Sequence, residues 1–362
     1  MGERGQGTTR QRKDGRWEAL LQVDGRRVSV YAETKPEVKA KLKQLRKDAI
    51  TKGGFVENHK LFELLDKWIE VDGHNWKPST RAGNLRYIAE IKETVENIAL
   101  TKITPLWIAS FYAKFKDTPR KALKLHQILH RVFNLALQWE WLFRNPASRV
   151  RPKYEQKEKI LWTPQQTREF LIKTKNDDWW PLFSFSLFTG LRTAEVAGLE
   201  RGDLDEESQT IKVNRTLHKV AGEWITGSPK TKAGKRIVHL EKTAREALER
   251  QRTLVTKWKE ECGAGWLESN RIFTNRSGGP LACTTADHAL ARLCKQLDLP
   301  VLSMHDLRHM NASLAIEAGA PLSQVSKHLG HANVSITASV YVRALGDSKI
   351  VSEALSKVLA GD

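Results

Sequence analysis

Hydrophobic and polar positions near the N-terminus follow a pattern that predicts β-strands. Two runs rich in β-branched and aromatic residues, 17–23 and 26–31, are separated by Asp24-Gly25. This dipeptide favours a two-residue hairpin turn, because both central positions of such a turn take positive φ. A further strand is expected over about 7–13, and a helix over 35–51. The N-terminal part is therefore predicted to be a three-stranded sheet followed by one helix.

The apolar pattern changes to helical spacing beyond this part. Proline stands at the start of three expected helices, at Pro78, Pro105 and Pro119, where its missing N–H costs no hydrogen bond. The apolar spacing of the helix that begins at Pro78 predicts that it continues through Val95 and Ile98. With the run that starts near Leu61, these segments predict a domain of four helices.

The rest of the chain mixes the two patterns. Short strands are expected at 210–213 and 237–240, on either side of a polar turn at 228–235, and the other apolar runs have helical spacing. The chain is predicted to be a multidomain, mainly α protein with small β elements, whose last large domain is mixed α+β. The expected parts are residues 1–57, 58–150, a linker at 151–160, 161–346 and a tail helix at 347–362.

Charge changes this picture by pointing to a partner. The 362 residues contain 60 Lys+Arg and 42 Asp+Glu, a formal net charge of +18. Residues 1–57, 58–150 and 151–362 each carry six more basic than acidic side chains. A single basic tail would have left the remainder neutral, so several basic modules that follow one polyanion explain the distribution better, and nucleic acid is the usual polyanion.

Composition also restricts the class of protein. Hydrophobic residues make up 40% of the chain, which excludes a disordered protein. No apolar run reaches the roughly 20 residues of a membrane span, and the polar residues 1–16 lack a secretory signal. The three cysteines are widely spaced without a CxxC pair, which argues against a disulfide scaffold or a cysteine zinc site. We expect a cytoplasmic protein with no membrane partner.

Two groups of basic residues are candidates for DNA contact. A two-stranded ribbon can enter a major groove, and one face of the fourth helix of the helical domain is predicted to be exposed. The candidates are Arg12, Lys13, Arg16, Arg26 and Arg27 on the ribbon, and Arg120, Lys121, Lys124 and Arg131 on the helix.

Common cofactor motifs are absent from the sequence. There is no GxxxxGK(S/T) loop, no GxGxxG and no GxSxG. ATP, NAD and serine-hydrolase chemistry therefore lack sequence support, and no cofactor is expected.

A first candidate cluster is TGLRTAEVAGL at 189–199. Arg192 follows a glycine turn at the start of a helix, where backbone N–H groups already favour an anion, and its forked donors suit phosphate. Glu195 lies one helical turn further on, where it can hold the guanidinium. Taken alone, an Arg with a Glu at i+3 is more often an ordinary surface pair.

The second cluster is HDLRH at 305–309. His305 and His309 at i, i+4 share a helix face, which is also the spacing of a zinc site. However, Arg308 stands beside the second histidine, no glutamate lies between the two, and a guanidinium would repel a divalent cation. We therefore interpret His305 and Arg308 as an acid/base group and a second cation for one anion, with no metal.

The third cluster is LGHANVSITASVYVR at 329–343, in which His331 precedes Tyr341 by ten residues. Taken singly, Tyr341 would be a half-buried helix tyrosine. In combination with Arg192, His305, Arg308 and His331 in this order, it becomes a candidate nucleophile.

These three motifs resemble those of the tyrosine recombinase family, the phage-type integrases. The resemblance covers about 163–345 in detail, and the preceding helical and N-terminal parts match the family's core-site and arm-site binding domains only in order and size. It implies a small arm-site domain at 1–57, a four-helix core-binding domain at 58–150 and a catalytic domain of the tyrosine recombinase type at 161–346.

The resemblance also implies residue roles. Arg192 and Arg308 would bind the scissile phosphate, Tyr341 would attack phosphorus to give a 3′-phosphotyrosine, His305 would assist proton transfer and His331 would hydrogen-bond the phosphate. Lys230, with Lys232 as the alternative, would be the general acid from a β-hairpin. Glu195 matches the acidic residue that supports the first arginine.

The implied protein is a site-specific recombinase that integrates and excises a phage or mobile element through a Holliday junction. Its partners would be core and arm attachment sites in double-stranded DNA, three further copies in a homotetramer, and possible host DNA-bending and excisionase proteins. The tail at 347–362 would pack on a neighbouring protomer or on its own domain. Alternatives are a dimer-resolving recombinase of the Xer type, a catalytically silent DNA-binding regulator and, less favoured, a metal-dependent nuclease.

Overall fold

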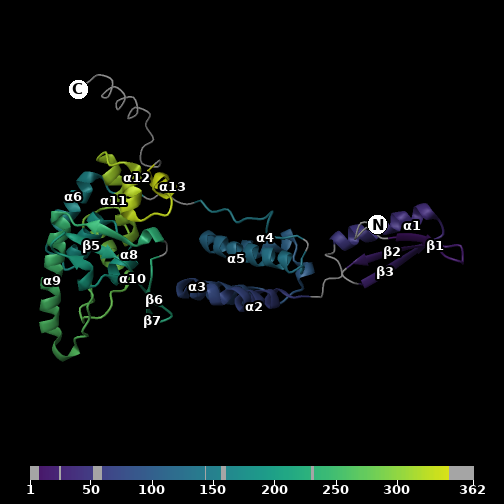
Figure 1. Ribbon diagram of the computed structural model, residues 1–362, viewed down its shortest axis with the longest axis horizontal. Helices are drawn as coiled ribbons and strands as arrows, with labels where there is room; N and C mark the ends of the chain where they lie inside the picture. The colour runs from purple at the N-terminus through teal and green to yellow at the C-terminus, as the bar shows by residue number, and fades with distance from the viewer. Residues whose placement is uncertain are drawn as a thin grey trace, which may run out of the picture. The chain divides into compact units, whose positions relative to one another are not determined.

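The computed structural model describes residues 8–23, 26–51, 59–142, 144–155, 160–229 and 232–341. The chain divides into two compact units, 1–157 and 158–362, which we describe separately (Figure 1). No helix of the described residues has the length and apolar character needed to cross a membrane.

The N-terminal module is the three-stranded sheet and helix that the sequence predicts. It contains β1 (Thr8–Gln11), β2 (Trp17–Val23), β3 (Arg26–Ala32) and α1 (Lys35–Thr51). The strands are antiparallel in the order β1-β2-β3, and Val23 pairs with Arg26, so only Asp24-Gly25 connects β2 to β3. The conformation of that dipeptide lies outside the described residues. One face of the sheet packs on α1 through a small core (Figure 1), formed by Ala19, Leu21, Ala32, Val38 and Leu42.

Four α-helices follow, as predicted: α2 (Leu61–Asp72), α3 (Pro78–Thr94), α4 (Pro105–Ala113) and α5 (Pro119–Gln138). They share one core, to which α5 contributes seven buried residues. The predicted end of α3 is wrong, because the helix stops at Thr94 and Val95 has extended backbone. The chain extends there to reach the bridge between Lys60 and Ala99, while Val95 and Ile98 still pack against the core.

The second unit is mixed α+β, as predicted. Its β-strands are β4 (Leu204–Asp205), β5 (Thr210–Val213), β6 (Thr216–Val220), β7 (Glu223–Gly227) and β8 (Arg236–His239). Its α-helices are α6 (Pro164–Lys173), α7 (Trp180–Thr189), α8 (Thr193–Gly198), α9 (Lys242–Cys262), α10 (Cys283–Gln296), α11 (Met304–Glu317), α12 (Leu322–Leu329) and α13 (Val334–Tyr341). The β-strands form a sheet in the order β4-β5-β8 and a separate β6-β7 hairpin.

Helix α7 lies at the centre of this unit. All its residues except Phe188 are buried, and it packs against both α9 and α11. The adjacent helices α11, α12 and α13 contact one another (Figure 1). A helix buried on every side is apolar all round, which explains why 180–189 contains no charged residue.

The β6-β7 hairpin is an element that the sequence patterns did not predict. Its strands are joined by Ala221-Gly222, with φ of 50° and 94°. Both values are positive, as a tight hairpin turn requires. The sequence signal is weak because Ala-Gly is not one of the usual turn dipeptides and the two strands show no regular alternation of buried and exposed residues. Of the polar turn expected at 228–235, residues 230–231 lie outside the description, and 232–234 form a short 3₁₀ turn before β8.

Candidate active site

A glycine turn places Arg192 at the end of α7. Gly190 has φ of 61°, and a Cβ there would lie 2.6 Å from Leu329 Cδ2 and 2.7 Å from Asn311 Oδ1. Glycine is thus required both by the backbone conformation and by the close packing. The turn leaves Arg192 as the N-cap of α8, with its Nη2 3.4 Å from the carbonyl oxygen of Gly330 at the end of α12.

Glu195 is the buried carboxylate of the site, with 1% of its surface exposed. It accepts hydrogen bonds from the Arg192 backbone N–H at 2.9 Å and from Arg192 Nη1 at 2.7 Å. It also accepts one from Arg236 Nη2 at 3.0 Å. Burial raises the pKa of Glu195, but the charges and hydrogen bonds of the two arginines outweigh burial and lower it overall. Glu195 is therefore ionised and fixes both guanidinium groups.

Arg308 on α11 is a buried cation, only 2% exposed. Its Nη1 donates to the Gly190 carbonyl at 2.7 Å and its Nη2 to the Leu329 carbonyl at 2.6 Å. Both acceptors are neutral, and no carboxylate of the described residues forms an ion pair with it. Burial and then the charge of Arg192 lower the pKa of Arg308 to about 9. Its charge is thus held in place without being neutralised.

His331 follows the left-handed Gly330 that caps α12. Its Nδ1 lies 2.8 Å from Thr337 Oγ1 on α13. Burial, followed by the charges of Arg308 and Arg192, lowers the pKa of His331 to about 4. The imidazole is therefore neutral at pH 7 and lies within electrostatic reach of both guanidinium groups.

Arg236 on β8 is a site residue that the sequence reasoning missed. In addition to Glu195, it donates to the His328 carbonyl at 2.7 Å and to the Gly234 carbonyl at 3.1 Å. A Cβ on Gly330 would lie 2.6 Å from the Ala233 carbonyl oxygen, so this loop packs tightly on the end of α12. The sequence signal for Arg236 is its position directly after the lysine-rich turn, but an arginine next to several lysines does not stand out from them.

His305 lies one helical turn before Arg308, in the first turn of α11. Its side chain is exposed, and its ring centroid lies 4.7 Å from that of His309. Asp306 caps the same helix by accepting from the Ser303 backbone N–H at 2.7 Å. Within the described ranges, no group of three His, Cys, Asp or Glu could hold a metal ion.

Two predicted residues can be placed only in part, and a third, Lys230, lies outside the described residues. Tyr341 is the last residue of α13, which packs on α11 and α12, but its side chain lies outside what the structure describes. Lys230 and the side chain of Lys232 also lie outside it. The backbone of Lys232 begins a short 3₁₀ turn, Lys232–Gly234, whose last residue accepts from Arg236.

Comparison with known proteins assigns the chain to a family. The model of the phage integrase family matches residues 160–346, and that of the phage integrase N-terminal SAM-like domain matches 60–116. The chain belongs to the phage integrase family. It is accordingly a site-specific recombinase of the phage or transposon type, as the motifs predicted.

Similar proteins cover most of this integrase-family chain. It is 26% identical to a tyrosine recombinase XerC-like protein of Caldanaerobacter subterraneus subsp. tengcongensis, over 89% of each chain. It is 27% identical to the ICEBs1 integrase of Bacillus subtilis, over 67% of each. It is 23% identical to the integrase of Mycobacterium phage L5, over 94% of this chain and 88% of that one.

Solved structures share the fold. The Tn1549 transposon integrase in complex with a circular intermediate DNA matches with a TM-score of 0.72 and 20% identity, over 83% of this chain and 99% of that chain. A lambda integrase tetramer bound to a Holliday junction matches with a TM-score of 0.60 and 14% identity, over 92% and 94%. The predicted multidomain fold of the tyrosine recombinase type is confirmed.

The candidate DNA-binding residues of the N-terminal module form two groups. Arg12, Lys13 and Arg16 lie in the exposed turn between β1 and β2, where Arg16 pairs with Asp14 at 2.8 Å. Arg26 and Arg27 begin β3 at the opposite end of the sheet, as the strand register shows, and their side chains lie outside the description. The five residues therefore do not make one cluster.

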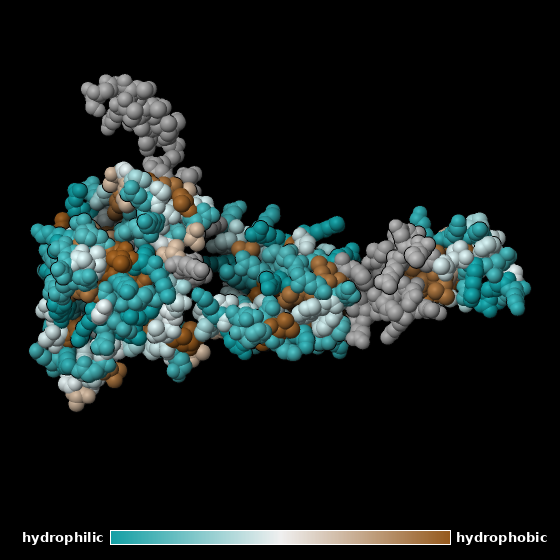
Figure 2. All heavy atoms as spheres, viewed as in Figure 1, coloured by the Kyte–Doolittle hydropathy of each residue, from teal (hydrophilic) through white to brown (hydrophobic). Residues whose placement is uncertain are grey.

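On α5, the four candidates differ in how they are held. Arg120 and Lys124 are exposed, whereas Lys121 pairs with Glu90 at 2.7 Å and Arg131 with Asp72 at 3.1 Å. An open cavity of about 790 Å³ lies beside three of these candidates. Its lining includes Arg120, Lys121 and Lys124 together with Arg86, Tyr87 and Tyr154. On the face shown in Figure 2, hydrophilic residues cover most of both units. The end of α5 near Arg120 therefore carries the exposed cations of this helix, and its contact with DNA stays a prediction.

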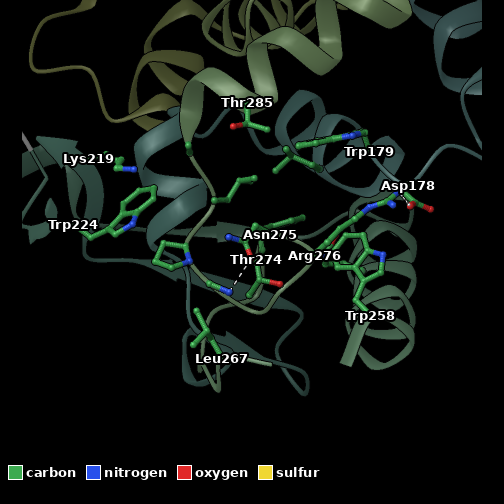
Figure 3. Close-up of a pocket in the computed structure, with 17 residues that line it drawn as sticks. Asp178, Trp179, Lys219, Trp224, Trp258, Leu267, Thr274, Asn275, Arg276 and Thr285 are labelled. Atoms are coloured by element: carbon green, nitrogen blue, oxygen red, sulfur yellow. Dashed lines mark hydrogen bonds and ion pairs between the residues drawn. The ribbon is translucent and has the colours of Figure 1, made fainter. Parts of the chain in front are cut away.

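A second cavity, of about 490 Å³, lies in the unit 158–362, and Figure 3 shows the side chains that line it. Its walls include Trp179, Trp224 and Trp258, and Trp224 comes from the unpredicted β6-β7 hairpin. None of the three arginines, Glu195 or His331 lines this cavity. The cation site is therefore not part of this apolar cavity.

Proposed function

We propose that this recombinase cleaves and rejoins DNA through transient transfer of a phosphodiester to Tyr341. The observation that carries the proposal is the charge balance of the site. Glu195 pairs with the guanidinium groups of Arg192 and Arg236. The charge of Arg308 also acts within this site but has no carboxylate partner among the described residues, so that positive charge exceeds negative charge there. A fixed excess of positive charge in a partly buried site stabilises an anion, and a DNA phosphate is the anion that a recombinase must hold.

Arg192 and Arg308 are the two arginines proposed to bind the phosphate, and different groups hold each of them in place. Glu195 orients Arg192, and two main-chain carbonyls orient Arg308. Both guanidinium groups would bind non-bridging oxygens of the scissile phosphate and neutralise the charge that grows in the pentavalent transition state. Because the protein fixes these donors before DNA arrives, little reorganisation is required during the reaction.

The proposed chemical step is a direct exchange of ester bonds. The phenolic oxygen of Tyr341 forms a bond to phosphorus while the bond from phosphorus to the 5′ oxygen breaks. His305 assists removal of the phenolic proton, and Lys230, with Lys232 as the alternative, protonates the leaving 5′ oxygen. The products are a 3′-phosphotyrosine and a free 5′-hydroxyl. Reversal by another 5′-hydroxyl rejoins the strand, so that the step requires neither ATP nor a metal.

His331 would donate a hydrogen bond to the same phosphate. Its low pKa keeps it neutral, so it contributes a donor without adding a further positive charge that would repel the arginines. This role fits its position between the end of α12 and helix α13.

We also propose roles for the parts of the chain. Residues 1–57 would bind arm sites and 58–150 core sites, and 151–160 would link them to the catalytic part at 161–346. The tail at 347–362 would pack on a neighbouring protomer or on its own domain. Four copies would act on a Holliday junction, assisted by DNA-bending and excision factors. Support comes from the lambda integrase tetramer on such a junction, whose fold this chain shares. Deletion of 1–57 should leave core-site cleavage within about threefold of the full chain and abolish arm-dependent recombination.

A second candidate function is resolution of chromosome or plasmid dimers. It is favoured by the XerC-like relative, which aligns with this chain over 89% of both proteins. The two functions differ in substrate. A dimer-resolving enzyme recombines two identical core sites without arm sites, whereas an integrase joins two different attachment sites.

Covalent trapping tests the proposal. Randomised duplexes bound by a Tyr341→Phe variant are selected and sequenced, and the enriched sequence is synthesised with one nick at each position in turn. A nick beside the scissile phosphate releases the 5′-hydroxyl fragment, so that a covalent adduct accumulates. The wild type should form this adduct in EDTA, while Tyr341→Phe should bind without forming it.

Tyr112→Phe is the matched control, because that hydroxyl is buried in the helical domain and bonded to His126 at 2.8 Å. It should form the adduct at the wild-type level. An adduct with Tyr341→Phe would refute the assigned nucleophile, and loss of the adduct in EDTA would show that the reaction needs a metal. Binding without any adduct from the wild type would favour a silent DNA-binding regulator.

A further inference from the structure

We propose that Thr337 is a positioning residue, which donates its hydroxyl proton to Nδ1 of His331 and thereby holds the imidazole with its own proton on Nε2. The inference rests on the proposed function, in which His331 donates to the phosphate. It adds a residue on the helix that ends in Tyr341, and so connects that helix to the phosphate site.

The contact is short and shielded from water. Thr337 Oγ1 lies 2.8 Å from His331 Nδ1, and Thr337 is 0% exposed. Helix α13 is held against α11 and α12, so the hydroxyl faces the end of α12 from a packed position. A hydrogen bond that water cannot reach has little competition, and loss of either partner leaves a buried polar group unsatisfied.

Other buried threonines of this unit behave differently. Thr167, Thr174 and Thr189 donate their hydroxyls to the carbonyl four residues earlier, at 2.9, 2.7 and 2.7 Å. This is the common arrangement for a threonine within a helix. Thr337 departs from it, because its hydroxyl is directed to the histidine ring. The departure leaves its proton available for the ring nitrogen.

The direction of this bond determines what His331 can do. A neutral imidazole has one N–H and one lone pair, and the partner of one nitrogen sets the state of the other. When Thr337 donates to Nδ1, the proton lies on Nε2 and can be donated to a phosphate oxygen. The opposite tautomer would present a lone pair to the anion, which is repulsive.

The surroundings of His331 keep it neutral. The charged and titratable groups that act on it are Arg308 and His309 from α11, Arg192 at the start of α8 and Arg236 from β8. All of them disfavour a positive ring. With protonation of both nitrogens disfavoured, the choice between the two neutral tautomers is left to the hydrogen bond from Thr337.

The bond also joins two elements that carry reacting groups. His331 follows the cap of α12, and the backbone of Tyr341 lies one helical turn beyond Thr337 on α13. A tether between the ring and α13 limits sliding of this helix relative to the phosphate site. Thr337 therefore acts through His331 and α13 without touching DNA.

The test compares Thr337→Val with Thr337→Ser in the full chain. Valine keeps the branched shape and removes the hydroxyl, whereas serine keeps the hydroxyl. With saturating selected nicked duplex, Thr337→Val should form the adduct about tenfold more slowly, with DNA affinity within twofold of wild type. Thr337→Ser should form the adduct at a rate within about threefold of the wild type. Thr174→Val, which removes a buried hydroxyl at the C-cap of α6, should match the wild type.

A double-mutant comparison separates positioning from packing. In a His331→Ala background, Thr337→Val should cause no further loss of rate, because the residue it positions is gone. A full tenfold loss in that background would overturn the proposal and show that Thr337 acts by packing α13. Failure of serine to restore the rate would overturn it in the same way.

The tautomer can be measured without the reaction. Nitrogen-15 NMR of the histidine-labelled chain, with the His331 signals identified by their loss in His331→Gln, should show an unprotonated Nδ1 and a protonated Nε2. A protonated Nδ1 in the wild type would overturn the proposal. If the wild type forms no adduct, the proposed function fails, while the NMR result still decides the role of Thr337.

Discussion

Basic residues are held in two different ways in the two units of this integrase-family protein. In the unit 158–362, Arg308 is 2% exposed and both of its bonded carbonyls come from segments distant in sequence. On α5, Arg120 and Lys124 are exposed and belong to one helix. A buried, fixed cation can stabilise a transition state at one position, whereas an exposed and screened cation contributes to binding anywhere along a phosphate backbone. We therefore expect Arg308 to affect the rate of DNA cleavage, and the exposed cations of α5 to affect the affinity for DNA.

The largest effect is expected for Arg308→Lys. Lysine keeps the charge but cannot bond both the Gly190 and Leu329 carbonyls while facing a phosphate. Adduct formation on the nicked duplex should fall about 10²–10³-fold, as is typical when one fixed transition-state donor is lost. The same change on α5, Arg120→Lys, should leave the rate unchanged within twofold. Equal losses of rate in Arg308→Lys and Arg120→Lys would contradict the distinction between a buried, fixed cation and an exposed one.

Glu195→Gln should come next. It removes the charge that Arg192 and Arg236 share, and we expect about 10²-fold slower cleavage and a loss of about 3 kcal/mol in the free energy of unfolding. Because the folded pKa of Glu195 is lowered, its stabilisation is present above its unfolded pKa and is lost as pH falls through the folded value. Denaturant unfolding of both proteins across this pH range measures the difference. A variant as stable as wild type at pH 7 would contradict it.

Gly330→Ala should have an intermediate effect. Its φ of 68° is unfavourable for alanine, and the new Cβ would meet the Ala233 carbonyl oxygen at 2.6 Å. We expect about 1–3 kcal/mol of destabilisation and slower cleavage, since the loop and His331 must shift. Gly222→Ala is the control, because φ there is also positive but no atom lies within 4 Å of its Cβ. Thermal unfolding should show a larger loss for Gly330→Ala than for this control.

The smallest effects are expected on the exposed surface. Arg120→Gln and Lys124→Gln should each weaken core-site binding severalfold and reduce the salt dependence of log Kd by about one unit. Lys121→Gln should have less effect, because its pairing with Glu90 at 2.7 Å already engages the charge. Binding isotherms at several salt concentrations measure both quantities. An unchanged salt slope for all three would remove α5 from the DNA-binding surface.

The sequence was informative wherever a local signal is strong. The proline starts of α3, α4 and α5 and the predicted strands β2 and β3 are all confirmed. Its failures have local causes as well. The β6-β7 hairpin carries a weak turn dipeptide, and α3 ends early because a bridge to Ala99 extends the chain. The structure brings the side chains of Arg192, Arg308 and His331 to one site. The roles assigned to these three residues, and to His305 and Tyr341, remain predictions.

What the sequence alone determined is the order of the elements, the basic character of every part and the motifs that identify the family. These depend on spacing along the chain, which composition and periodicity record directly. The tertiary structure decided which charges are neutralised. Arg236 reaches Glu195 across 41 residues, whereas Arg308 reaches Leu329 across 21 residues and has no carboxylate partner among the residues that the structure describes. Such pairings depend on folding, because it brings distant segments together and removes the water that would otherwise screen their charges.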